Sequence, residues 1–151
     1  MTEIVLRTAS LDDVPMLAEM NTQLIHDEGS PNPMDIVQLT ERMREWLSSD
    51  RDAVIVERGD DVVGYLLYRI LRDEYYPYKN SIYVRQYFIK PTYRRRGIGQ
   101  IAFESIVSDY FPDDHAIMLD VLESNPEGKA FWQKIGFDVY HTTMRREVHP
   151  K

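Results

Sequence analysis

Three adjacent arginines, Arg94 to Arg96, stand directly before two closely spaced glycines, Gly97 and Gly99. The β-branched and aromatic run at 82–89 precedes them and an apolar-periodic run follows, which predicts a strand, a turn and the start of a helix. A helix start binds anions because its first N–H groups are unpaired and its dipole is positive there. Glycines allow close approach to the main chain, and arginines add permanent charge. The stretch therefore predicts a site for a ligand with more than one phosphate.

Two other interpretations fit the same glycines. With Ala102 they match the glycine pattern of dinucleotide-binding proteins, and Asp120 lies about 20 residues further on, where a ribose ligand is expected. Against this, the glycines stand well after the strand instead of in a tight first βα turn, and they come late in a short chain. The arginines are also compatible with a basic helix cap that binds nothing.

A second block of residues follows downstream: Asn125, then Ala130-Phe131-Trp132-Gln133-Lys134-Ile135-Gly136-Phe137. The spacing Arg94-x-x-Gly97-x-Gly99 resembles the acyl-CoA pyrophosphate loop of the GNAT family of N-acetyltransferases. The second block is similar to that family's Asn…Ala-x-Tyr-x-Lys-x-Gly-Phe segment, and the two blocks together span about 82–137 in the family's order. The resemblance implies an enzyme that transfers the acetyl group of acetyl-CoA directly to a primary amine of a small molecule or peptide.

The resemblance also implies where the cofactor lies. Its acyl arm would enter a splay between the parallel strands 82–89 and 116–121, and the Ile89 N–H would donate to the thioester carbonyl, a bond that strengthens as charge develops there. Trp132 occupies the position of a proton-donating tyrosine in relatives; an indole N–H can hold the sulfur but has no usable acidity. The residues implied to bind the cofactor are Phe88, Ile89, Arg94, Arg95, Arg96, Gly97, Ile98, Gly99, Gln100, Asn125 and Lys134.

The acceptor side carries no motif. Strand 82–89 has Arg85 and Gln86 where relatives often have acids, so a general base must come from elsewhere. Several groups are candidates, and deprotonation of the amine in bulk water is a further alternative; the candidate bases are His26, Glu28, Glu74 and Asp120. Tyr87 and Tyr140 are candidates to replace the general acid. The residues expected to contact the acceptor are His26, Glu28, Arg85 and Tyr87.

A function from another class also fits these residues. Trp132 at the proton-donor position, together with the missing strand carboxylate, is compatible with a CoA-binding sensor or regulatory module that has no turnover. Release of CoA in the presence of amines separates an enzyme from such a module.

The elements that must position these groups alternate in type. The sequence predicts strands at 4–7, 53–57, 62–69, 82–89 and 116–121, final strands within 137–148, and helices at 11–25, 35–47, 97–111 and 126–135. The fold expected from the resemblance is an α/β GNAT fold. Its mixed sheet would have six or seven strands, helices on both faces, and a splay between two central parallel strands.

Composition narrows the function classes. A length of 151 residues favours one domain over 1–151. A net charge of −7 disfavours nucleic-acid binding, and zero cysteines exclude disulfides, thiolate metal sites and a cysteine nucleophile. The sequence has no run of about 18 apolar residues and no charged-then-apolar leader, so we expect a cytoplasmic protein that binds no membrane. We also expect that it binds no metal. The family resemblance adds a homodimer as an expectation.

Overall fold

The computed structural model describes residues 3–72, 75 and 80–150. Within them a five-stranded sheet runs in the order β1-β2-β3-β4-β5, antiparallel from β1 to β4 and parallel between β4 and β5. The strands are β1 (Ile4–Thr8), β2 (Asp52–Arg58), β3 (Asp61–Arg72), β4 (Asn80–Ile89) and β5 (His115–Leu119). The helices are α1 (Val14–Asp27), α2 (Ile36–Ser48), α3 (Ile98–Tyr110) and α4 (Pro126–Lys134). This is the α/β architecture that the sequence predicts.

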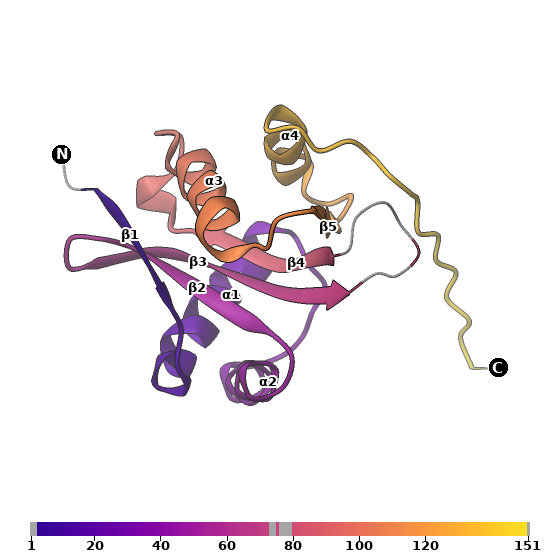
Figure 1. The fold of residues 1–151 in the computed structure, drawn as a ribbon. Coiled ribbons are helices and arrows are strands. Elements are labelled where there is room, and N and C mark those ends of the chain that lie inside the picture. The colour runs from indigo at the N-terminus through magenta and orange to yellow at the C-terminus, as the bar shows by residue number, and fades with distance from the viewer. Residues whose placement is uncertain (1–2, 73–74, 76–79, 151) are drawn as a thin grey trace.

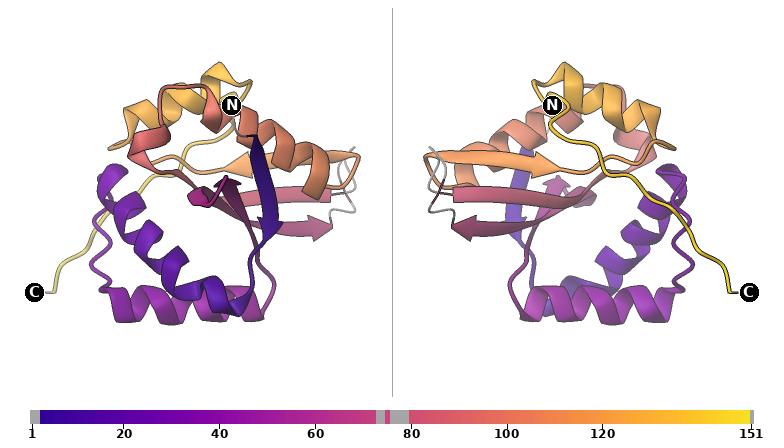
Figure 2. Two further views of the ribbon diagram at one scale, coloured as in Figure 1. Left: turned by 90° about the vertical axis from the view of Figure 1, so that its left-hand side faces the viewer. Right: turned by 90° about the vertical axis from the view of Figure 1, so that its right-hand side faces the viewer.

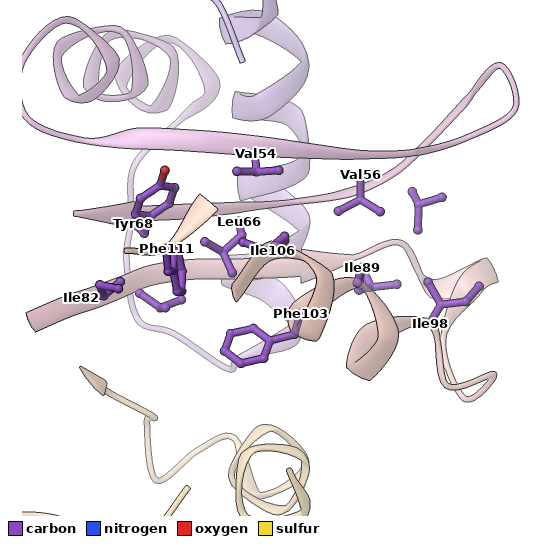
Figure 3. Packing of buried hydrophobic residues seen from close by; sticks show 13 residues of the cluster. Val54, Val56, Leu66, Tyr68, Ile82, Ile89, Ile98, Phe103, Ile106 and Phe111 are labelled. Atoms are coloured by element: carbon purple, nitrogen blue, oxygen red, sulfur yellow. The ribbon is translucent and has the colours of Figure 1, made fainter. Parts of the chain in front are cut away.

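The helices cover the two faces of the sheet in pairs, α1 with α2 on one face and α3 with α4 on the other (Figures 1 and 2). A separate apolar core fills each side. Figure 3 shows the core under α3, where Ile106 and Phe103 of the helix meet Leu66 and Ile89 of the sheet. The core under α1 and α2 contains Leu17, Met43, Ile55, Tyr65 and Phe88.

Local signals in the sequence set the helix starts. Asp35 accepts from the Gln38 N–H at 2.9 Å while the Gln38 side chain accepts from the Asp35 N–H, so α2 begins with a capping box. Pro126 occupies the first turn of α4, where its missing N–H costs nothing. These starts lie within one residue of the predicted ones.

β4 contains a bulge at Arg85. Leu67 of β3 pairs with Gln86 and Tyr68 pairs with Val84, so Arg85 has no partner in the register. The extra residue inverts the alternation of side chains along the strand. Val84 therefore belongs to the core under α3, whereas Gln86 lies on the α1 and α2 side.

The pairing of β4 with β5 stops at the same place. It runs from Asn80 with His115 to Val84 with Leu119, and β4 then continues to Ile89 without β5 beside it. The second half of β4 thus has an open edge, which is the splay expected between the two parallel strands.

Two parts of the predicted sheet differ from the structure. Residues 137–150 form no strand, so the sheet has five strands within the described residues instead of six or seven, and β5 is an edge strand rather than a central one. The reason lies in the spacing of the apolar residues. Val139 and Met144 are five positions apart, so an extended chain places them on opposite faces and offers no single apolar face to bury. Both are exposed, at 64% and 90%.

None of the described helices combines the length and the apolar character needed to cross a lipid bilayer.

Candidate functional site

The loop from β4 into α3 presents unpaired amides. The first helical hydrogen bond of α3 runs from the Ile101 N–H to the Gly97 carbonyl at 3.1 Å, so the N–H groups of Ile98, Gly99 and Gln100 precede the helical ladder. Gly97 has a φ of +76°, and a Cβ built on it meets nothing within 4 Å, so the backbone there is open to a ligand. Arg95 also has a positive φ, +63°, and backbone strain of this kind is concentrated at functional sites.

The three arginines of this loop have different surroundings. Arg95 and Arg96 are exposed. Arg94 instead turns back into the protein, donating from Nε to the Ile89 carbonyl at 2.7 Å and from Nη2 to Asp27 Oδ2 at 2.5 Å. Its guanidinium therefore fastens the loop to the end of β4 and to α1, and only Arg95 and Arg96 are left to reach a phosphate directly.

Asp27 is adapted to this contact. Burial alone would raise the pKa of the Asp27 carboxyl, but the bonds it accepts from Arg94 and from Gln23 Nε2, the latter at 2.8 Å, lower it below its ordinary value. The carboxylate is thus charged at neutral pH and holds Arg94 in place.

The Ile89 N–H points to the open edge of β4. The Lys90 N–H donates to the Val63 carbonyl at 2.8 Å, which makes Lys90 and Val63 a hydrogen-bonded pair of the antiparallel ladder. Such pairs alternate, so Ile89 opposite Gly64 is a non-bonded pair whose N–H faces away from β3, toward the side that β5 has left. By the same alternation the Phe88 backbone faces β3. Phe88 and Ile89 are the two residues expected near a thioester, and of these two only Ile89 directs its N–H to the open edge of β4.

Aromatic side chains fill the space between β4, α3 and α4. The Tyr87 hydroxyl donates to the Gly99 carbonyl at 2.5 Å, and its burial raises the pKa of Tyr87. Trp132 packs at 5.7 Å from the Tyr87 ring, 5.2 Å from Phe103 and 5.2 Å from Phe137, measured between ring centres. Trp132 is therefore a packing residue of this core as well as the residue at the tyrosine position.

Arg85 and Gln86 both lie on the face covered by α1 and α2. Consecutive strand residues ordinarily point to opposite faces, and the bulge is what brings these two together. The Gln86 side chain is buried, 6% exposed, and accepts from the Tyr65 hydroxyl at 2.7 Å. Arg85 lies over the Trp46 ring of α2, with its guanidinium carbon 5.5 Å from the ring centre.

Glu28, just after α1, belongs to the same region. Burial raises the pKa of its carboxyl, Arg85 opposes that shift and Asp27 adds to it. The Glu28 backbone carbonyl accepts from the Ser124 hydroxyl at 2.8 Å, so the α1 end also contacts the segment between β5 and α4. Of the expected acceptor contacts, the structure thus brings Glu28 and Arg85 together, whereas Tyr87 points to the opposite face and His26 is exposed in the last turn of α1.

The remaining residues predicted as cofactor, base or acid groups lie apart from Glu28 and Arg85. Asn125 caps α4 by accepting from the Gly128 N–H at 3.1 Å, and Lys134 is exposed in the last turn of that helix. Asp120 accepts from the Tyr83 hydroxyl at 2.5 Å. Tyr140 is 73% exposed in the C-terminal segment. Glu74 lies outside the described residues.

Three residues linked to Arg85 were not expected at the site from the sequence: Asn21, which accepts from Arg42, then Arg42, which shares the Trp46 ring with Arg85, and Trp46 itself. The first two are polar residues on apolar helix stripes, Asn21 between Leu17 and Leu24 and Arg42 between Leu39 and Trp46. A polar residue at such a position is buried with the stripe, and this is the signal that could have identified them.

No group of three or more potential metal ligands occurs among residues 3–72, 75 and 80–150.

Comparison with known proteins connects this geometry to one family. The family model described as acetyltransferase (GNAT) family matches residues 18–137. No protein among the curated ones matches the chain.

Solved structures resemble the whole chain. A possible acetyltransferase from Clostridium difficile superposes with a TM-score of 0.76 at 22% identity, covering 97% of this chain and 99% of the other. A predicted acetyltransferase from Clostridium acetobutylicum, solved with acetyl-CoA, gives 0.73 at 18% identity and 96% of both chains. An aminoglycoside acetyltransferase from an uncultured soil metagenomic sample, in complex with sisomicin, gives 0.69 at 12% identity, with 98% and 97% covered.

Proposed function

Because the chain belongs to the acetyltransferase (GNAT) family, we propose that it transfers the acetyl group of acetyl-CoA directly to a primary amine of a small molecule or peptide. The observation that carries the proposal is the open half of β4 beside the unpaired amides that begin α3. The two features adjoin, since only 90–97 separates them in the chain.

The residues present fit acetyl-CoA. Its diphosphate would lie on the amides of Ile98 and Gly99, with the exposed Arg95 and Arg96 supplying positive charge. The open space at Gly97 leaves room for the phosphate oxygens. The pantetheine amides would pair with the open edge of β4, which otherwise has backbone groups facing no strand.

Bound acetyl-CoA supplies an activated acetyl group on a thioester. The Ile89 N–H would hold the thioester oxygen and stabilise the charge that grows on it as the amine nitrogen attacks. The N–C bond forms, the C–S bond breaks, CoA leaves as a thiolate, and the acylated nitrogen releases one proton to solvent to become the amide. Because the donor is a backbone group, side-chain substitution at Ile89 leaves it in place.

Glu28 is our choice for the general base. An amine with a pKa near that of lysine is mostly protonated at pH 7 and must lose a proton before it attacks. A carboxylate whose pKa is raised toward neutrality accepts that proton more readily than an ordinary one, directly or through a water molecule.

The leaving thiolate needs no strong acid. A thiol pKa near 8.5 makes the thiolate a tolerable leaving group, which solvent protonates. We therefore give Trp132 a packing role, and Tyr87, whose raised pKa makes it a weak acid, a structural one.

Further proposals concern the setting of the enzyme: one domain over 1–151, a cytoplasmic location, a homodimer, and neither nucleic acid, membrane nor metal among its partners.

Two measurements test the proposal. Calorimetry with CoA reports binding, and thiol release from acetyl-CoA with a panel of amines reports transfer. We expect both, and we expect Gly99→Asp to abolish binding, since it sets a carboxylate against the diphosphate. Absence of CoA binding would refute the placement of the site. Tight binding with no release above hydrolysis would instead establish the sensor alternative.

A further inference from the structure

Three arginines surround the Trp46 indole on the face covered by α1 and α2. The guanidinium carbons of Arg42, Arg51 and Arg85 lie 4.3, 5.3 and 5.5 Å from the centre of the ring. They come from α2, from the residue before β2 and from the β4 bulge. A guanidinium is attracted to an aromatic face, so the indole holds these like charges close together. We call the three residues the arginine cluster.

The arginine cluster is short of negative charge. Arg51 pairs with Asp50 at 3.3 Å, but neither Arg42 nor Arg85 has an ion pair within 4.0 Å in the part of the chain that the structure describes. Burial lowers the pKa of Arg42, and the charge of Arg85 lowers it further. An excess of positive charge thus persists at one place on a protein whose net charge is −7.

Buried donors around the cluster have no acceptor. Asn21 is 1% exposed, and its Oδ1 accepts from Arg42 Nη2 at 3.1 Å, but its Nδ2 has no partner. The Nε atoms of Arg42 and Arg51 are also buried without one. Buried donors without acceptors are rare in folded proteins because they cost free energy. Oxygen atoms from a bound anion would satisfy them, and a carboxylate offers two such atoms.

The arginine cluster adjoins the proposed transfer site. Arg85 is the bulge residue at which β5 leaves β4, and it precedes Ile89 by only four residues. Glu28 interacts electrostatically with both Arg85 and the buried Tyr65 hydroxyl, which places its carboxylate on the same face. One side of the site thus offers a base for an amine, and the other offers guanidinium groups for an anion.

Resting on the proposed function, we propose that the acceptor is an amino-carboxylate, a small molecule whose primary amine lies next to a carboxylate, as in an amino acid. The carboxylate binds the arginine cluster and the amine faces Glu28. A polycation such as a polyamine or aminoglycoside would instead bring positive charge against three guanidinium groups.

The first test compares acceptors in matched pairs. Each common amino acid is assayed beside the amine that remains when its carboxylate is removed, with spermidine as a polycation. Thiol release gives kcat/KM, and calorimetry on the CoA-loaded protein gives Kd. We expect amino acids to have a kcat/KM about tenfold or more higher, and a Kd about tenfold or more lower, than their decarboxylated partners, which is the factor that a charge-assisted contact provides.

Variants then assign the preference to the cluster. Arg85→Gln removes a charge from a side chain that is exposed, so the fold is retained. We expect it to lower kcat/KM and affinity for amino acids about tenfold relative to those for the decarboxylated amines. Because Arg85 also influences the pKa of Glu28, turnover of both classes can change, and the ratio between the classes is the quantity that reports the carboxylate contact. Arg44→Gln is the matched control, since Arg44 is an exposed arginine of α2 that forms an ion pair with Glu41 on the same helix. It should change neither class.

The outcomes separate the two proposals. Equal or better binding and turnover of decarboxylated amines or spermidine would overturn the amino-carboxylate and leave acetyl transfer standing. The same holds if Arg85→Gln weakened both classes alike. If CoA bound but no acceptor were acetylated, the transfer proposal would fail. The Kd of each amino acid, compared with that of its decarboxylated partner, would still decide whether the arginine cluster selects a carboxylate.

Discussion

Glu28 combines features that are seldom found in one side chain. Its carboxyl is partly buried, so its pKa is raised, yet it lies beside Arg85, whose charge favours the ionised form. Burial is the larger of the two effects. The result is a carboxylate that gains a proton at higher pH than an exposed one, which suits a base but makes activity sensitive to mild acid.

Glu28→Gln tests this role. A base acts when deprotonated, so kcat/KM should fall as pH drops through the Glu28 pKa, which lies above the ordinary 4.5. The variant should lose about 100-fold in kcat and should lack this acidic limb, keeping only the limb that belongs to the substrate amine. Glu19→Gln, at an exposed glutamate of α1, should behave as the parent. A Glu28→Gln profile with the limb intact would assign the base elsewhere.

At the level of elements, the site depends on how β4 meets its neighbours. Gly64 of β3 stands opposite Ile89, and a Cβ built on Gly64 would lie 1.9 Å from the Phe88 carbonyl oxygen. Both partners are backbone groups of paired strands, so neither can yield without moving a strand. Only glycine permits this close approach, and the approach fixes the direction of the Ile89 N–H.

Gly64→Ala should therefore damage stability and catalysis together. We expect a loss of about 1–3 kcal/mol in the free energy of unfolding, or more, because the clash is with backbone. We also expect a lower kcat as Ile89 shifts. Denaturant unfolding and steady-state kinetics measure the two. Gly99→Ala is the stability control, since its Cβ would meet side-chain atoms, the edge of the Phe131 ring at 3.3 Å and Ile89 Cγ1 at 3.9 Å. Unchanged stability in Gly64→Ala would contradict the strand spacing.

The Arg94 contact joins α1, β4 and the loop before α3. If Arg94 positions that loop, Arg94→Gln and Asp27→Asn should each raise the KM for acetyl-CoA about tenfold, and the double variant should be no worse than either. If Arg94 instead contacts phosphate, Asp27→Asn should leave the KM unchanged.

The ion pair between Arg94 and Asp27 should stabilise the fold fully above pH 3.8, the ordinary Asp pKa, and should lose that effect as the pH falls through the lowered pKa of Asp27.

The elements carrying strong local signals were predicted from the sequence. Glycines, capping residues and apolar periodicity located α3, α4 and the turn between β2 and β3, because those features act within a few residues. The bulge at Arg85 leaves no such signal, since it arises from the register between two strands. Without it, alternation puts Arg85 and Gln86 on opposite faces, and the acceptor side of the site remains hidden.

The whole molecule has an open sheet edge and an exposed apolar segment. β5 pairs only with β4 in the described residues, and residues 137–150 leave α4 and run away from the sheet as an extended chain (Figure 1). Beyond Phe137, the large apolar side chains of that segment are exposed: Val139, Tyr140, Met144 and Val148. An unpaired strand edge and an exposed apolar segment each favour association with another chain, which is consistent with the proposed homodimer.

Sedimentation velocity tests this association. A homodimer would have twice the 17.8 kDa mass of the chain, and dilution should shift it toward the monomer.

The double variant Val139→Lys with Met144→Lys should sediment as a monomer, because lysines at these positions oppose burial against a partner. Since both side chains are exposed, the variant should keep the fold and should unfold at the temperature of the parent when the parent is diluted to the monomer. Thr142→Lys, also exposed, adds charge without removing an apolar group and should remain dimeric. A parent chain that is monomeric at every concentration would exclude the homodimer.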